Sequence, residues 1–284
     1  MEPTAPAAAR PCLNCGAHLA GAFCHDCGQR DQPVDLPARE IARGALGDVF
    51  AWDGRFWGTV RLLLRRPGFL SAEWAAGRRA RYIPPLRLYV IATLLFVGAD
   101  ATYGFAKSAL HDDGDVATVE QVEEEENPMK GFVPSNRLER ADQYMEGMMG
   151  LGLRWFFVVM PLGGFGLYVL YHHRRPSYAS HFVVSIHVFV VVILSLAIIE
   201  GIKLVWVLVP PHETLNHAVR EGSWVLLGCA FLACYLYAVL SVRRFYGLSL
   251  PKALVSAPAV TVAPLLGWFG IIMLRLMLAM AWPA

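Results

Sequence analysis

The stretch Arg78-Arg79-Ala80-Arg81-Tyr82-Ile83-Pro84-Pro85-Leu86-Arg87-Leu88-Tyr89 divides the chain into two parts of different character. The sequence before it is basic and rich in Trp, whereas the sequence after it is apolar for most of its length. Basic residues that flank a membrane span are retained on the cytoplasmic side. This arginine cluster therefore predicts the orientation of every span that follows.

The composition is that of a membrane protein. The 284 residues are 56% hydrophobic and 17% charged, and the mean hydropathy is +0.42. Soluble globular proteins carry more charge and fewer apolar residues. We therefore expect an all-α integral membrane protein with a small soluble part. Residues 1–11 are expected to be a flexible leader without the basic and apolar regions of a cleavable signal peptide.

Two Cys-x-x-Cys-Gly motifs lie within residues 12–30. Four thiolates at this spacing suit tetrahedral zinc, and the candidate ligands are Cys12, Cys15, Cys24 and Cys27. The glycine after each pair can adopt the turn that directs backbone N–H groups at the sulfurs. Four cysteines leave no open coordination position, so the zinc would be structural and would supply the folding free energy of a small zinc ribbon.

Other readings of the cysteines remain open. Disulfides are the main alternative, and a reducing cytoplasmic side disfavours them. His18 and His25 could replace a ligand, although we expect both to face solvent. Cys229 and Cys234 lie in an apolar run, where buried and inert thiols are expected.

Residues 34–85 alternate apolar and basic positions at helical spacing. One apolar stripe runs through Ile41, Ala45, Val49 and Trp52, and a second runs through Phe56, Val60, Leu63 and Leu64. Pro67-Gly68 is expected to end the second helix, and Ser71 to cap a short one that ends near Gly77.

The apolar side of these helices is expected to enter the membrane interface while the arginines meet anionic headgroups. The arginines in question are Arg61, Arg65, Arg66, Arg78, Arg79 and Arg81. The alternative is a small helical core that packs against the ribbon. Nucleic acid is disfavoured as a partner, because the basic residues are interleaved with residues of buried type.

Five stretches of residues 86–284 have the roughly 20 apolar residues that a span requires. They are residues 86–106, 151–171, 182–209, 223–242 and 253–282. Pro161 and the nearby glycines are expected to bend the second. Four spans are the alternative, with the first stretch re-entrant because it is short and contains Asp100.

The loops carry alternating charge. Residues 107–150 are acidic and are expected to be exoplasmic, whereas the loops with Arg174 and Arg175 and with Arg243 and Arg244 are expected to be cytoplasmic. The prediction is therefore a multi-pass protein with a cytoplasmic N-terminus and an exoplasmic C-terminus.

The motifs also resemble a known family. The Cys-x-x-Cys-Gly pairs, Arg65-Arg66-Pro67-Gly68, and the run from Gly77 to Tyr89 resemble a bacterial family of membrane proteins, the domain-of-unknown-function family 3667. The resemblance covers about residues 12–100. It implies a zinc-binding head and a bacterial inner membrane, and it implies no activity.

Charges inside spans are rare and mark function or pairing. Counted from the cytoplasmic ends at 1.5 Å per residue, Asp100 lies roughly 21 Å deep and Glu200 roughly 27 Å deep in a layer about 30 Å thick, and Arg275 lies near its outer boundary. With Lys203, they are candidates for an intramembrane polar layer that forms an ion or solute path. The alternative is snorkelling near the outer interface together with a structural salt bridge.

Smaller features have structural explanations. His181 and His187 are spaced unlike ligands on one helix face, so we expect them to lie in the core or at an interface. Ala259, Ala263 and Gly267 recur every fourth residue, which permits close helix packing.

No nucleophile elbow, phosphate loop or nucleotide fingerprint is present in the sequence, so no catalytic residues are predicted. The ribbon is interpreted as a docking or regulatory head for a protein at the membrane surface. A transporter or channel is the second hypothesis and a lipid enzyme the third. A homo-oligomer is left open.

Overall fold

The computed structural model describes residues 10–33, 54–111, 152–175, 177–208 and 213–262. The helices are α2 (Arg55–Arg65), α3 (Phe69–Ala75), α4 (Pro85–His111), α7 (Gly152–Tyr171), α8 (Tyr178–Leu208), α9 (Glu213–Tyr246) and α10 (Leu250–Ser256). The part of the chain that the structure describes holds no strand, only the isolated bridges Pro11–His18 and Phe23–Arg30. The prediction of an all-helical chain is confirmed for these residues.

Three of the described helical stretches are long and apolar enough to cross a membrane: Pro85–Lys107, Tyr178–Leu208 and Val225–Tyr246. α4 has 27 residues, or about 40 Å at 1.5 Å per residue, which is ample for a bilayer. α9 extends beyond the predicted fourth span at both ends, so residues 213–222, predicted as loop, are helical. Most of the predicted fifth span lies outside the described residues.

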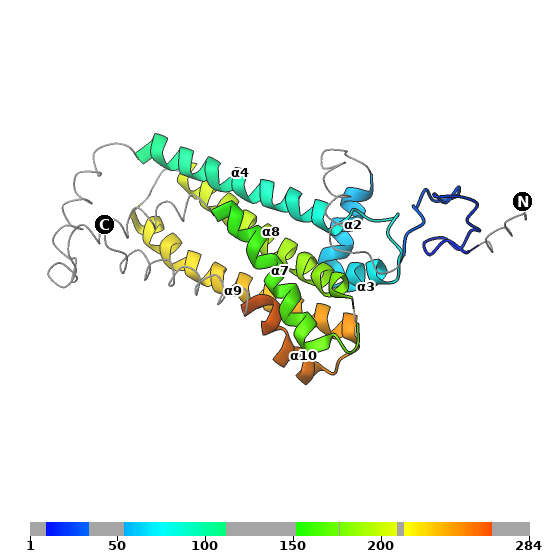
Figure 1. Cartoon of the computed structure of the whole chain (residues 1–284). Coiled ribbons are helices and arrows are strands. Elements are labelled where there is room, and N and C mark those ends of the chain that lie inside the picture. The colour runs from blue at the N-terminus through cyan, green and yellow to red at the C-terminus, as the bar shows by residue number, and fades with distance from the viewer. Residues whose placement is uncertain (1–9, 34–53, 112–151, 176, 209–212, 263–284) are drawn as a thin grey trace, which may run out of the picture.

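α8 is the central helix of the bundle formed by α4, α7, α8 and α9. It packs against each of the other three, which lie lengthwise beside it in Figure 1. Its first half is buried on nearly all sides, from Ala179 to Ile193, because α3 closes the remaining face. This explains why the segment is rich in Val and Ile, and why its polar side chains, such as His181, Ser185 and His187, form hydrogen bonds with neighbouring segments.

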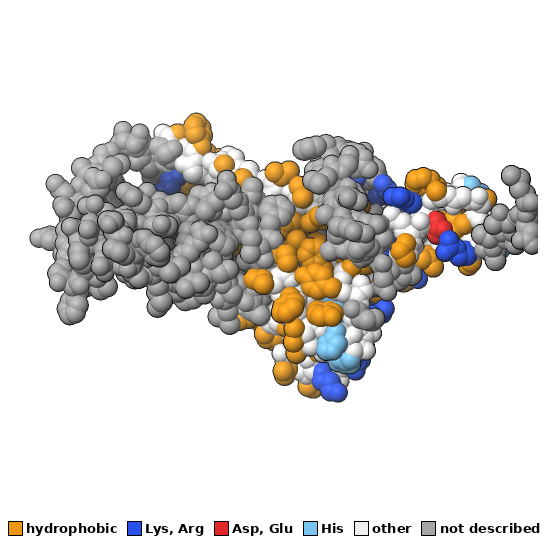
Figure 2. All heavy atoms as spheres, in the orientation of Figure 1, with side chains coloured by type: hydrophobic (Ala, Val, Ile, Leu, Met, Phe, Trp, Pro, Cys, Tyr) orange, Lys and Arg blue, Asp and Glu red, His pale blue; other side chains and the backbone are white. Residues whose placement is uncertain are grey.

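The other helices of the bundle leave apolar side chains on the outside. Leu95 on α4, Phe165 and Val169 on α7, and Leu232 and Leu236 on α9 are exposed. Figure 2 shows hydrophobic side chains across the middle of the molecule. In a membrane this surface contacts lipid. Cys229 is exposed there, contrary to expectation, whereas Cys234 is buried and donates to Ser195 Oγ at 3.5 Å.

Pro161 and the glycines of α7 do not interrupt that helix, which runs unbroken through Pro161. A Cβ atom at position 166 would lie 2.7 Å from the carbonyl oxygen of Ala259. The glycine therefore permits a close contact with the chain beyond α10. Ala259 belongs to the predicted small-residue stripe, whereas Ala263 and Gly267 lie outside the described residues.

α2 and α3 close one end of the bundle. Thr59 and Leu63 of α2, and Leu70 and Trp74 of α3, are buried, and α3 packs against α8 and α9. Of the predicted stripe on α2, Leu63 is buried against the bundle, whereas Leu64 is 50% exposed. The bundle therefore covers only part of the apolar side, and insertion of the rest into the membrane interface stays a prediction. Ser71 lies inside α3 and does not cap it; Gly68 occupies the N-cap. The stripe from Ile41 to Trp52 lies outside the described residues.

Candidate metal centre and its contact with the membrane helices

The ribbon (residues 10–33) consists of two turns with the same hydrogen bonds, offset by twelve residues. In the first turn the N–H of Cys12 donates to Ala17 and that of Gly16 to Cys12, at 2.8 and 2.9 Å. In the second turn, Cys24 donates to Gln29 and Gly28 to Cys24 at the same distances. Gly16 and Gly28 have φ values of 83° and 71°, which glycine adopts without strain. Each Cys-x-x-Cys-Gly motif is thus one knuckle.

The two knuckles bring four sulfurs together. The Sγ atoms of Cys12, Cys15, Cys24 and Cys27 all lie within 4.8 Å of one another. The shortest separations join the knuckles: Cys12 to Cys27 at 3.6 Å, and Cys15 to Cys24 at 3.5 Å. Four sulfurs arranged tetrahedrally at 2.3 Å from a zinc ion lie about 3.8 Å apart. The thiols are free, and the arrangement can hold a metal ion.

The backbone favours thiolates in this cluster. Burial raises the pKa of Cys12, but the N–H groups of Cys15 and Asn14 outweigh it and lower that pKa to about 7. The N–H groups of Cys27 and Asp26 likewise lower the pKa of Cys24.

Repulsion between neighbouring thiolates opposes the ionisation of all four cysteines at once. The N–H of Ala17 lowers the pKa of Cys15, but burial and the three neighbouring sulfurs raise it to about 12. Like charges this close disfavour joint ionisation, and a cation among them reverses that effect. The cluster therefore has the chemistry of a metal site. His18 and His25 are exposed and lie outside the group of sulfurs.

The ribbon rests on the loop that leads into α4. We call residues 77–80 the seat loop. The Gln29 amide donates to the carbonyl of Gly77 at 2.8 Å and accepts from the N–H groups of Arg79 and Ala80 at 3.0 and 3.1 Å. A Cβ atom at position 77 would lie 2.6 Å from Cδ1 of Leu13, so Leu13 packs directly on the loop. No sequence pattern predicts a role for Gln29, because its role depends on a contact with a residue 48 positions away.

The predicted membrane-surface arginines have different surroundings. Arg78 is tied to Glu73, with its Nε 2.8 Å from Oε2. Arg79 lies over the Trp74 ring at 4.3 Å. Arg66 lies over Phe69 at 5.8 Å. Arg61, Arg65 and Arg81 are exposed. In Figure 2 the Lys and Arg side chains gather mainly at the end of the molecule that carries α2, α3 and the ribbon.

The structure brings together only part of the predicted polar layer. Lys203 binds both carboxylate oxygens of Glu200, at 2.9 and 2.7 Å, and lies 4.3 Å from the centre of the Tyr103 ring. Asp100 is exposed, and within the described ranges no ion pair reaches it. Arg275 lies outside the described residues. The Glu200–Lys203 pair fits the structural alternative better than an open path.

The two histidines of α8 are buried at helix contacts. His181 contacts the Tyr246 hydroxyl at 2.6 Å and the carbonyl of Arg175 at 2.8 Å. His187 contacts Ser71 Oγ at 2.8 Å and so joins α8 to α3. Both were expected at an interface; the Ser71 partner was not anticipated, because Ser71 was assigned to a helix cap.

Comparison with known proteins gives a family match and nothing else. No curated protein and no solved structure matches the chain. Residues 53–97 match the model of a protein family of unknown function. The match includes α2, α3, the seat loop and the first half of α4, but not the ribbon. The matched family is the one that the sequence motifs resemble, the DUF3667 family of proteins of unknown function, and the match is confined to residues 53–97.

Proposed function

We propose that the chain is a multi-pass membrane protein whose N-terminal ribbon is a zinc-dependent docking head. The observation that carries this proposal is the attachment of the four-cysteine ribbon to the seat loop by Gln29 and Leu13. Because the seat loop leads into α4, a protein bound to the ribbon would be held against the first membrane helix. The ribbon would also stand clear of the bundle, as Figure 1 shows.

Zinc is the metal that this donor set favours. Soft thiolates in a tetrahedral arrangement select zinc among the common structural ions. Cys12, Cys15, Cys24 and Cys27 would supply all four ligands and leave no position for water or substrate. The ion would therefore cross-link the two knuckles and take no part in catalysis. We accordingly propose a binding role without enzymatic activity.

The charge distribution supports a cytoplasmic head. α4 leaves the basic end of the molecule, α7 returns to it, α8 leaves it, and α9 returns to it. Contacts at this end support that order: Arg174 Nη1 donates to the carbonyl of Tyr246 at 2.9 Å, and Ser71 meets His187. Retention of basic residues inside then gives a cytoplasmic N-terminus. We propose the bacterial inner membrane as the location, with an exoplasmic C-terminus and anionic headgroups at the inner face.

The ribbon keeps an apolar residue free for a partner. Phe23 is 62% exposed, whereas Leu13 is engaged with Gly77. Exposed aromatic residues on a rigid support are favoured anchors for protein contacts. Phe23 is therefore our candidate for the centre of the docking surface.

Site-specific photo-crosslinking in cells tests the proposal. A probe at Ala20, exposed in the connection between the knuckles, should give one discrete protein adduct. The adduct should vanish in C24S/C27S and weaken in Phe23→Ser, which keeps all four ligands. An unchanged adduct in both variants, or no adduct from a stable zinc-loaded protein, would reject the docking role. Glu200→Gln serves as the matched membrane variant: loss of solute flux in proteoliposomes, with the adduct intact, would favour the transporter hypothesis.

A further inference from the structure

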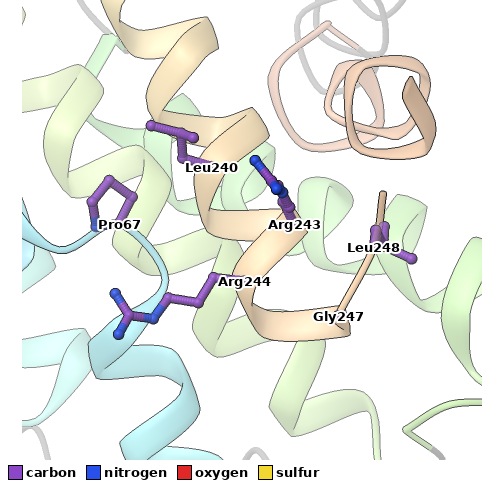
Figure 3. A pocket seen from close by; sticks show the side chains of 6 residues that line it. All are labelled: Pro67, Leu240, Arg243, Arg244, Gly247 and Leu248. Atoms are coloured by element: carbon purple, nitrogen blue, oxygen red, sulfur yellow. The ribbon is translucent and has the colours of Figure 1, made fainter. Parts of the chain in front are cut away.

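A cavity of about 470 Å³ opens where α9 ends against the connection between α2 and α3. We call it the arginine pocket. Its lining residues are Pro67, Leu240, Arg243, Arg244, Gly247 and Leu248. Figure 3 shows Pro67 facing the last turn of α9, from which Arg243 and Arg244 project, with Gly247 and Leu248 at the turn that follows. Its volume is within the range of about 300–1,000 Å³ that is typical of small-ligand sites.

The pocket carries positive charge without compensation from its own walls. Two of its six lining residues are arginines and none is acidic. Among the described residues no carboxylate pairs with Arg243 or Arg244. Arg174 already donates to the carbonyl of Tyr246 at the end of α9. The C-terminal carbonyl groups of α9 are therefore served by Arg174, and the side chains of Arg243 and Arg244 are available to a ligand.

A third guanidinium, that of Arg66, belongs to the residue directly before the lining residue Pro67. Arg66 and Arg244 lie over the same ring, Phe69, with their Cζ atoms 5.8 and 5.3 Å from its centre. Stacking on an aromatic ring leaves the N–H groups at the edge of a guanidinium free to donate. Two arginines held by one ring, from α9 and from the end of α2, are suited to a phosphate with several oxygens.

Close packing fixes the two residues that directly follow the lining residues Pro67 and Leu240. Gly68, at the N-cap of α3, has a φ of 72°, and a Cβ atom at this position would lie 2.6 Å from the carbonyl oxygen of Ser241. The connection between α2 and α3 therefore touches α9 backbone directly. A site whose walls are fixed in this way needs little ordering on binding.

The position of the pocket indicates which phosphate it takes. The candidate span Val225–Tyr246 ends within the pocket, so the pocket lies at a membrane boundary. Leu240, one turn before the arginines, is 45% exposed on the apolar side. Figure 3 shows the side chains of Arg243 and Arg244 pointing in different directions, and Arg244 shares the Phe69 ring with Arg66. A ligand with a phosphate beside Arg244 and Arg66, within the positive field of Arg243, and an acyl chain along Leu240 fits both surfaces. We propose that the arginine pocket binds the headgroup of an anionic phospholipid such as phosphatidylglycerol. The site is separate from the ribbon and independent of the docking role.

Native mass spectrometry of the full chain tests this site. The chain, released from nanodiscs that contain equal amounts of phosphatidylglycerol and phosphatidylcholine, should retain one phosphatidylglycerol. The R243Q/R244Q variant should bind it at least about tenfold more weakly, since each basic residue near a membrane surface contributes roughly 1 kcal/mol. The matched control R61Q/R65Q removes the same charge from exposed positions of α2 outside the pocket and should bind like the original chain.

Three results would overturn the proposal. An equal loss of bound phosphatidylglycerol in R61Q/R65Q would mean that the basic surface as a whole attracts the lipid. Full retention in R243Q/R244Q would place the lipid elsewhere. If millimolar inorganic phosphate displaced the bound phosphatidylglycerol as effectively as added phosphatidylglycerol does, the pocket would be a site for free phosphate. Photoactivatable phosphatidylglycerol on the unmodified chain provides a readout that needs no variant: the label should map to residues 240–248, and a label confined to other segments rejects the site.

Discussion

The ribbon and the helical bundle are held together in opposite ways. In the ribbon, the buried residues are Cys12, Asn14 and Cys24, which are too few to form a core. In the bundle, one continuous cluster of buried side chains joins α2, α3, α4, α7, α8 and α9. One chain thus combines a unit that has too few buried side chains to fold by packing, for which we propose a bound metal ion, with a unit whose fold depends on packing. Each should fail under a treatment that spares the other.

The largest expected effect is loss of the ribbon fold on removal of the metal. The C24S/C27S variant should lose zinc because two of the four ligands are removed. The ribbon should then unfold, because structural zinc contributes about 10–16 kcal/mol to the folding of such modules. Metal analysis by mass spectrometry and limited trypsin cleavage at Arg10 and Arg30 should show the change. Far-UV circular dichroism should show the helices unaffected. A helical signal that collapses together with zinc would break the comparison, since it would make the bundle depend on the ion.

His25→Ala is the control for this experiment. His25 is exposed and lies outside the sulfur cluster. The variant should therefore bind zinc as the original chain does. A loss of zinc in His25→Ala would instead assign this histidine a ligand role.

The second effect falls on the bundle. Gly68→Val would force a side chain onto the Ser241 carbonyl at a φ of 72°. We expect a destabilisation of about 2–4 kcal/mol, seen as a lower thermal unfolding midpoint in detergent, with zinc content unchanged. Gly58→Ala is the matched control, because nothing lies within 4 Å of a Cβ atom there. A helical glycine replaced by alanine in open space should stabilise α2 by about 0.5–1 kcal/mol. The same lowered midpoint in both variants would contradict this reading.

The third effect concerns the contact between the two units. Gln29→Ala removes three hydrogen bonds to the seat loop, and the lost contact should amount to about 1–3 kcal/mol. Hydrogen exchange at the Arg79 and Ala80 amides should become faster, while the zinc content and the helices stay as they are. Amides that remain equally protected would show that Leu13 alone attaches the ribbon.

The smallest effect is a pH-dependent one. Hydrogen bonds from Arg78 lower the pKa of Glu73 below its ordinary value of 4.5. A carboxylate with a depressed pKa stabilises the fold above its unfolded pKa, and the contribution is lost as pH falls through the folded pKa. Because Arg78 is partly exposed, Glu73→Gln should cost less than about 1 kcal/mol at pH 7. The difference in melting midpoint should shrink as the pH falls below 4.5 and vanish once the pH is below the lowered pKa of the folded state. A difference that persists there would mean that packing, and not charge, is involved.

Sequence reasoning predicted the features that depend on local pattern. The spacing of Cys12, Cys15, Cys24 and Cys27 indicated one cluster, and the apolar stretches indicated helices, both of which the structure shows. Contacts between segments that are distant in the sequence could not be predicted in this way. The bonds of Gln29 to the seat loop and of Ser71 to His187 span 48 or more residues, and no periodicity encodes them. The burial of α3 was missed for the same reason, since an apolar stripe looks alike whether lipid or protein covers it.

The twelve-residue repeat of the ribbon has one further consequence. Two knuckles with the same hydrogen bonds present nearly interchangeable surfaces, so a symmetric head could rest on the seat loop in either of two orientations. The two knuckles differ at the position that contacts the seat loop: Gln29 in the second knuckle corresponds to Ala17 in the first. Only Gln29 carries an amide that can both donate to and accept from the loop backbone. Gln29 thus removes the ambiguity of a duplicated unit and, together with Leu13 of the first knuckle, sets one orientation of the ribbon on the seat loop.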